Sequence, residues 1–254
     1  MQDRYAGDIG DYGKIGLLRA IQRTGLSIGI NWYKTEPTKQ EYHQDGRFRQ
    51  EDGKYRIPPQ LAECDPELAG ILLDISAKES RSIKDIQKAR LIPNAEYYDK
   101  EISIEQRGKW HGMALKKLAN ANVVFLDPDN GMLVKSVRKN AEQSVKYTFY
   151  EEVEDYVGRG QSVIVYNHRS RKKAETYFRE ICDRFREMEA IQDKAINAIT
   201  FPRYTVRDYF IISANDKHGL KIQEALNQLL KSTWGEKRMC CLPALPAIQR
   251  LSNE

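Results

Sequence analysis

The chain has 254 residues, of which 41% are hydrophobic and 30% are charged, and its formal net charge is +5 at pH 7. This length and composition indicate one soluble globular domain with a sizeable core. The chain has no apolar run near the roughly 20 residues needed to cross a bilayer, and its first residues lack the apolar region of a signal peptide. We therefore expect a cytoplasmic protein with no membrane partner. The mild positive charge permits a polyanionic partner such as nucleic acid.

The four cysteines lie at positions 64, 182, 240 and 241. None of them forms a CxxC pair, and a vicinal pair is a poor basis for a disulfide or a zinc site. The sequence therefore predicts neither a structural metal nor a disulfide framework.

Hydrophobic periodicity and capping signals predict the following elements in chain order. Helices are expected over residues 8–24, 65–78, 82–90, 103–120, 148–158, 174–185 and 218–230. Strands are expected over residues 26–33, 95–98, 122–126, 162–166, 195–201 and 208–214. The helix starts rest on the proline after Asp65 and on two capping boxes, Ser103 with Gln106 and Thr148 with Glu151.

Strands alternating with helices predict an α/β fold with a Rossmann-like, doubly wound, mostly parallel sheet. The last two strands are separated only by a turn over residues 202–207, which is too short for a crossover helix, so the sheet should end in an antiparallel hairpin. We expect a single domain over residues 1–231, with a polar insertion at about 36–60, and an irregular tail over residues 232–254.

The insertion interleaves aromatic and basic residues, a mixture that suits single-stranded nucleic acid. Its aromatic residues are Tyr42, Phe48 and Tyr55, and its basic residues are Lys39, Arg47, Arg49, Lys54 and Arg56. Five acidic residues balance these charges, so a solvated loop is an equally good interpretation.

The segment VVFLDPDNG at residues 123–131 is the most informative motif. Four apolar residues predict a buried strand, and the carboxylates of Asp127 and Asp129 follow at its carboxyl end. Ligands bind in the crevice at the carboxyl ends of strands in open α/β sheets. Pro128 and Asn130 belong to the same turn.

The next strand, SVIVY, also ends in polar residues, Asn167, His168 and Arg169. Two parallel strands joined by one helix are usually neighbours, so we expect these side chains to face Asp127 and Asp129 across a shared crevice. Carboxylates, amides, an imidazole and a guanidinium form a plausible reaction centre.

A third polar motif, YAGDIGDYGK, occupies residues 5–14. This motif contains the carboxylates of Asp8 and Asp11, the amine of Lys14 and three glycines, one of which is Gly7. Glycines at this density suggest close approach of the backbone to a neighbouring group. A simple turn and helix cap is the alternative interpretation.

These motifs and their order resemble class I S-adenosylmethionine-dependent methyltransferases, and most of all the ribosomal RNA adenine-N6 methyltransferases of the RlmJ type. Asp127-Pro128 resembles the start of the family's DPPY motif, whose aspartate hydrogen-bonds the target amino group and whose aromatic ring stacks on the extruded base. Gly7, Asp11 and Lys14 match the family's N-terminal segment, which reaches into the active site. The resemblance implies catalytic roles for Asp127 and Lys14 and S-adenosylmethionine as the cofactor, bound near Gly7, Asp11, Tyr33 and Pro128.

The sequence departs from the family in two places. Asp129 and Asn130 replace the second proline and the aromatic residue of DPPY, so a tyrosine such as Tyr5, Tyr12 or Tyr166 would have to supply the stacking ring. No glycine-rich loop follows the first strand, where residues 31–37 read NWYKTEP.

Three functions remain open from the sequence. The first is methylation of a base amino group in nucleic acid, with Asp127, Asp129, Asn130, His168 and Lys14 as catalytic residues. The second is a Mg²⁺- or Mn²⁺-dependent nuclease or phosphodiesterase, in which Asp127 and Asp129 bind the metal, His168 is the general base, and Arg169 or Lys14 holds the phosphate. The third is a non-catalytic nucleic-acid-binding module.

Overall fold

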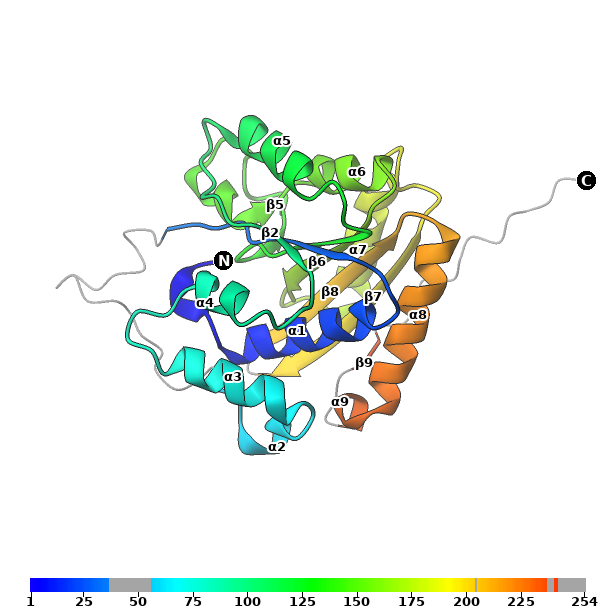
Figure 1. The fold of residues 1–254 in the computed structure, drawn as a ribbon. Helices are drawn as coiled ribbons and strands as arrows, with labels where there is room; N and C mark the ends of the chain where they lie inside the picture. Colours follow the sequence, from blue (N-terminus) through cyan, green and yellow to red (C-terminus); the bar gives the residue numbers. More distant parts are fainter. Residues whose placement is uncertain (37–55, 204, 237–239, 242–254) are drawn as a thin grey trace, which may run out of the picture.

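A computed structural model describes residues 1–36, 56–203, 205–236 and 240–241. Its described strands include a seven-stranded sheet in the order β2-β1-β3-β6-β8-β7-β9, with helices on both faces (Figure 1). The strands are β1 Ile28–Asn31, β2 Glu96–Tyr98, β3 Val123–Leu126, β6 Ser162–His168, β7 Ala195–Arg203, β8 Thr205–Ser213 and β9 Cys240–Cys241. Strands β2, β1, β3 and β6 are parallel to one another, whereas β8 pairs antiparallel with β6 and β7. The predicted α/β class and mostly parallel sheet are confirmed.

The helices follow the predicted order closely. They are α1 Ile9–Gln22, α2 Pro59–Ala62, α3 Pro66–Ser76, α4 Ile83–Lys88, α5 Arg107–Lys117, α6 Tyr150–Gly158, α7 Ala174–Arg186, α8 Asp216–Lys231 and α9 Thr233–Glu236, with the short 3₁₀ helices η1 Asp3–Tyr5 and η3 Glu142–Lys146. Asp65 caps α3, because its side chain accepts a hydrogen bond from the backbone N–H of Leu68. In the described part of the chain, no helix combines the length and apolar character that a membrane span requires.

Alternate residues of the central strands enter two separate cores. Val123 and Phe125 of β3 point into a core shared with α1, α3 and α8. Val124 and Leu126 point into a core shared with α5, α6 and α7. Side chains of a strand alternate between its faces, so a continuous apolar run is what a strand covered on both sides requires.

Most of the predicted polar insertion, residues 37–55, lies outside the described residues. The described residues after it lead directly into α2 and α3, and α2 begins at Pro59, before the predicted end of the insertion.

Two helix starts differ from the predictions. Helix α5 begins at Arg107 rather than Ser103, because a turn precedes it, and Ser103 Oγ accepts from the backbone N–H of Gln106 at 3.4 Å. Helix α6 begins after Phe149, whose backbone N–H donates to the Glu152 carboxylate at 2.9 Å, so Phe149 takes the N-cap position that was predicted for Thr148. A small parallel sheet of β4 Gly131–Met132 and β5 Tyr147–Thr148 precedes α6 and was not predicted.

The C-terminal region is more regular than expected. Strands β7 and β8 continue through the predicted turn over residues 202–207, so Arg207 lies within β8. The predicted irregular tail contains α9 and β9, and β9 pairs antiparallel with β7. Trp234 of α9 packs against α1, where a side chain on Gly16 would lie 2.5 Å from the indole ring.

Candidate functional site

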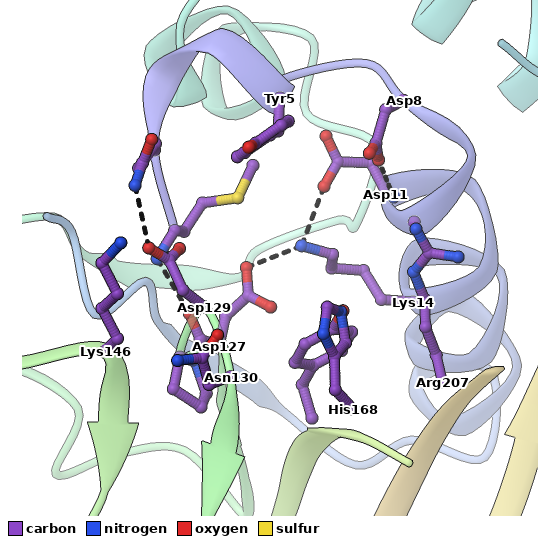
Figure 2. Close-up of a pocket in the computed structure, with 15 residues that line it drawn as sticks. Tyr5, Asp8, Asp11, Lys14, Asp127, Asp129, Asn130, Lys146, His168 and Arg207 are labelled. Atoms are coloured by element: carbon purple, nitrogen blue, oxygen red, sulfur yellow. Dashed lines mark hydrogen bonds and ion pairs between the residues drawn. The ribbon is translucent and has the colours of Figure 1, made fainter. Parts of the chain in front are cut away.

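Polar side chains from five segments meet at the carboxyl edge of the parallel strands and line a cavity of about 170 Å³ (Figure 2). The segments are the N-terminal residues with α1, the loop after β3, the end of η3, the end of β6 and the start of β8. Strands β3 and β6 are direct neighbours, with Leu126 opposite Val165. Of the polar residues that follow these two strands, Asp127, Asp129, Asn130 and His168 line the cavity, whereas Asn167 and Arg169 do not. The predicted residues that line the cavity are Asp11, Lys14, Asp127, Pro128, Asp129, Asn130 and His168.

Lys14 lies at the centre of a buried charge cluster. Its Nζ is 2.6 Å from Asp127 Oδ2 and 2.8 Å from Asp11 Oδ1, and all three side chains are at most 5% exposed. Burial alone would lower the pKa of Lys14, but the two carboxylates raise it above its ordinary value. Lys14 therefore remains an ammonium that holds the α1 carboxylate and the β3 carboxylate together.

The Asp127 carboxylate stands directly after β3 and is 2% exposed. Burial raises its pKa, although Lys14 and the α-ammonium of Met1 act in the opposite direction. Lys14 donates to Oδ2, and no described residue donates a hydrogen bond to Oδ1. The aspartate therefore keeps one acceptor atom for a ligand in the cavity.

Asp129 is held more firmly than Asp127. Its carboxylate is 2.7 Å from the α-ammonium of Met1 and accepts hydrogen bonds from Thr35 Oγ1 at 3.0 Å and Gln2 Nε2 at 3.1 Å. Burial opposes ionisation, but these contacts keep its pKa below the ordinary value. Asp129 is therefore an ionised group that anchors the N-terminal residues over the cavity.

Asp8 lies at the amino end of α1 and caps it, because Oδ1 accepts from the backbone N–H of Asp11 at 2.9 Å. Burial and the charge of Asp11 raise its pKa to about 6, while Arg207 and Lys14 act in the opposite direction. A carboxyl group with this pKa can give up or take a proton near neutral pH.

His168 and Arg207 face each other across the β6–β8 pair. Burial and the neighbouring guanidinium lower the pKa of His168 to about 4, so its imidazole is neutral at pH 7. A neutral imidazole can accept a proton or a hydrogen bond, which a protonated imidazole cannot.

The guanidinium in the cavity comes from Arg207, not from Arg169, which the nuclease interpretation offered as an alternative to Lys14. Arg169 makes a two-point contact with Asp208, at 2.9 and 2.6 Å, and also donates to Thr200. The antiparallel direction of β8 places its beginning at the edge where β6 ends, which is why Arg207 reaches the site.

Two residues expected at the cofactor do not line the cavity. Gly7 has φ +85°, and a side chain there would lie 2.6 Å from the Leu72 carbonyl of α3, so its role is to let the N-terminal turn pack closely. Tyr33 is fully buried on the other face of the sheet, where its hydroxyl donates to Glu152 at 3.0 Å. Its φ is +44°, and the chain continues past it in the direction of β1, with Lys34 bridged in parallel to Glu101.

The sequence did not indicate Lys146 or Arg207 as lining residues. Lys146 belongs to a stretch without periodicity, and it returns to the site because its carbonyl accepts from the backbone N–H of Asn130 at 2.9 Å. Arg207 could have been found, because an antiparallel strand added to β6 must begin beside His168.

Two of the three suggested tyrosines line the cavity. Tyr5 and Tyr166 contribute rings to its wall. Tyr12 is fully buried elsewhere, with its hydroxyl donating to the Leu61 carbonyl at 3.0 Å and accepting from the backbone N–H of Asp65 at 2.8 Å. Tyr5 and Tyr166 are therefore the rings available in place of the missing DPPY aromatic residue.

The arrangement fits a divalent cation poorly. Lys14 and the α-ammonium of Met1 already occupy the positions next to Asp127 and Asp129 that a metal would need. Within the described ranges, no group of three or more histidine, cysteine, aspartate or glutamate side chains is placed to hold a metal ion.

The residues after β1 differ from the family's glycine-rich loop. Trp32 and Tyr33, which stand where the resemblance would place that loop, are fully buried.

Comparison with known proteins gives weak structural similarity to solved structures. No family model matches the sequence, and no curated protein matches it. The solved structure of protein LPL1258 from Legionella pneumophila, described with the family model DUF519, matches with a TM-score of 0.45 and 13% identity over 95% of this chain and 99% of that one. Similarity at this level gives no basis for transferring a function.

Proposed function

We propose that this protein is methyltransferase-like and acts on nucleic acid, holding the exocyclic amino group of a base at Asp127. The order of strands supports the proposal, because the Asp127 strand lies at the centre of a parallel sheet whose far side ends in an antiparallel hairpin. The N-terminal segment also covers the same aspartate, as the resemblance to the RlmJ-type enzymes implies.

The observation that carries the proposal is the state of the Asp127 carboxylate. It is buried, it is paired with Lys14 through Oδ2, and its Oδ1 has no donor among the described residues. An amino group is the complementary donor, and a hydrogen bond to an ionised carboxylate is about twice as strong as one between neutral groups. Accepting that bond makes the amino nitrogen more electron-rich.

The remaining wall of the cavity suits a flat heterocycle. Tyr5 and Tyr166 contribute aromatic rings to the lining, while Asn130 and neutral His168 offer hydrogen-bonding groups for the edge of a base. A base within a duplex cannot reach such an enclosed site, so the target nucleotide must be single-stranded or extruded.

The test is binding and methylation with Asp127→Asn. Wild-type protein should bind single-stranded oligonucleotides and transfer a labelled methyl group from S-adenosylmethionine to them. Asp127→Asn keeps the size of the side chain but removes the charge, and we expect at least a hundredfold loss of methyl transfer. Asp193→Asn, at an exposed position far along the chain, is the matched control and should behave as wild type.

A thermal-shift panel separates this proposal from the nuclease alternative. A ligand at 100 times its dissociation constant adds about 2.7 kcal/mol of stability. S-adenosylmethionine or S-adenosylhomocysteine should stabilise the protein. No response to either, together with a response to Mn²⁺ that Asp127→Ala abolishes, would contradict the proposal and favour a metal-dependent nuclease.

A further inference from the structure

A second cavity lies beside the first, between residues 132–136 and α7. Its volume is about 550 Å³, within the roughly 300–1,000 Å³ typical of ligand pockets. Met132, Leu133, Val134 and Ile181 form its apolar wall. Val134 is 43% exposed, an unusual level for a large apolar side chain in the described part of this chain. The cavity therefore offers an apolar surface that the protein itself does not cover.

The two cavities share a wall formed by Asn130 and His168. The backbone N–H of His168 donates to the Asn130 carbonyl at 3.2 Å, and Asn167 Oδ1 accepts from the backbone N–H of Met132 at 2.7 Å. These bonds tie the loop after β3 to the end of β6. Groups bound in the two cavities would therefore be immediate neighbours at a fixed separation.

The charges around the second cavity are balanced, with three basic and three acidic side chains. Its ionic side chains are Lys135, Lys172, Arg184, Glu180, Asp183 and Glu187. Lys172 pairs with Glu180 at 2.6 Å, and the Arg184 guanidinium stacks 3.9 Å from the centre of the Tyr150 ring. This wall suits a neutral group with apolar faces and polar edges better than it suits a phosphate.

We propose that the second cavity binds the nucleoside next to the target nucleotide, so that the substrate is a polynucleotide strand rather than a free nucleotide. A nucleoside has the required neutral ring and polar edges. Two adjacent nucleosides are joined through one phosphate, so only an oligonucleotide can fill both cavities with a single ligand. The inference rests on the proposed function, because it takes the first cavity as the site of the target base.

The test compares a mononucleotide with a trinucleotide, using fluorescence anisotropy against wild type and two variants. Val134→Asn replaces an exposed apolar residue without disturbing the core, and Ile181→Gln makes the wall of α7 polar. Ile71→Gln is the matched control, because Ile71 is also half-buried and lines a separate hollow between α1 and α3. Wild type should bind the trinucleotide at least tenfold more tightly than the mononucleotide.

We expect both variants to lose about tenfold in trinucleotide affinity and to keep the mononucleotide affinity, while the control loses neither. Equal losses for both ligands, or no loss, would overturn the second site and leave the first intact. If wild-type protein binds the mononucleotide and the trinucleotide with equal affinity, that result would also overturn the second site and leave the first intact. Wild-type protein that binds neither ligand would overturn the proposed function together with this inference.

Discussion

Lys14 illustrates how one residue holds the site together. Its ammonium is the cation of a triad in which carboxylates from α1 and from the end of β3 would otherwise repel each other. Removing one member of a buried ionic group leaves the others uncompensated, whereas removing a pair relieves part of that cost. The Asp127 carboxylate, which lines the cavity, is thus also a structural group.

Lys14→Met should lower the free energy of unfolding by about 3–5 kcal/mol, measured by urea denaturation. The double variant Lys14→Met/Asp127→Asn should be more stable than Lys14→Met alone, because it also removes the unpaired charge. Lys78→Met is the control, since Lys78 is 51% exposed in its pair with Asp85. This substitution should lower the free energy of unfolding by at most about 1 kcal/mol. A loss for Lys14→Met as small as for the control would contradict the central role of the triad.

The ionisation of Asp8 should change how the free energy of unfolding depends on pH. Its pKa is about 6 in the folded protein against an ordinary 3.8, so between these values the folded state holds a proton that the unfolded state releases. Asp8 therefore makes the free energy of unfolding fall as pH rises from about 4 to 6. His168, with its pKa lowered from 6.5 to about 4, acts in the opposite direction over the same range.

Asp8→Asn isolates the contribution of Asp8, because asparagine also caps helices. The stability of the variant relative to wild type should increase between pH 4 and pH 6 by on the order of 1–3 kcal/mol. Urea denaturation at several pH values measures this difference. A difference that does not change with pH would show that Asp8 ionises normally.

At the level of elements, the sequence predicted the strand ends better than the loops between them. The apolar runs before Asp127 and Asn167 identified two buried strands, and the single helix between them identified them as neighbours. Arg207 was missed because a proline five residues earlier suggested a turn, although Pro202 is accommodated within β7. Lys146 was missed because no periodic pattern marks residues 133–147, which return to the site through hydrogen bonds of the backbone.

Gly131 of β4 allows the loop after β3 to pack against β6. Its φ is +112°, and a Cβ there would lie 2.0 Å from Asn167 Oδ1. Gly131→Ala should therefore displace the loop that carries Asp129 and Asn130, lower stability by about 2–4 kcal/mol, and abolish oligonucleotide binding.

Gly160→Ala is the control for Gly131→Ala. Gly160 has a similar positive φ of +86° but no atom within 4 Å of an added Cβ. Gly160→Ala should lower the free energy of unfolding by about 1–2 kcal/mol, from backbone strain alone, and leave oligonucleotide binding unchanged. If both variants bind oligonucleotide like wild type, Gly131 has no part in shaping the site.

At the level of the whole molecule, the alternation of strands and helices was sufficient to predict the architecture, because each strand had to be covered on both faces. The alternation of side chains between the faces of a strand accounts for Tyr33. Ile30 and Trp32 enter the core shared with α1, and Tyr33 enters the opposite core, as successive residues of an extended segment do.

The pairing of His168 with Arg207 has a consequence for how the protein matures. The cavity needs side chains from the first residues of the chain and from β8, which are about two hundred positions apart in sequence. During synthesis the nascent chain can complete its N-terminal helix and parallel strands while the cavity still lacks one wall. The complete cavity therefore forms late, when the C-terminal hairpin inserts, and incomplete chains released from the ribosome would lack the wall that Arg207 supplies.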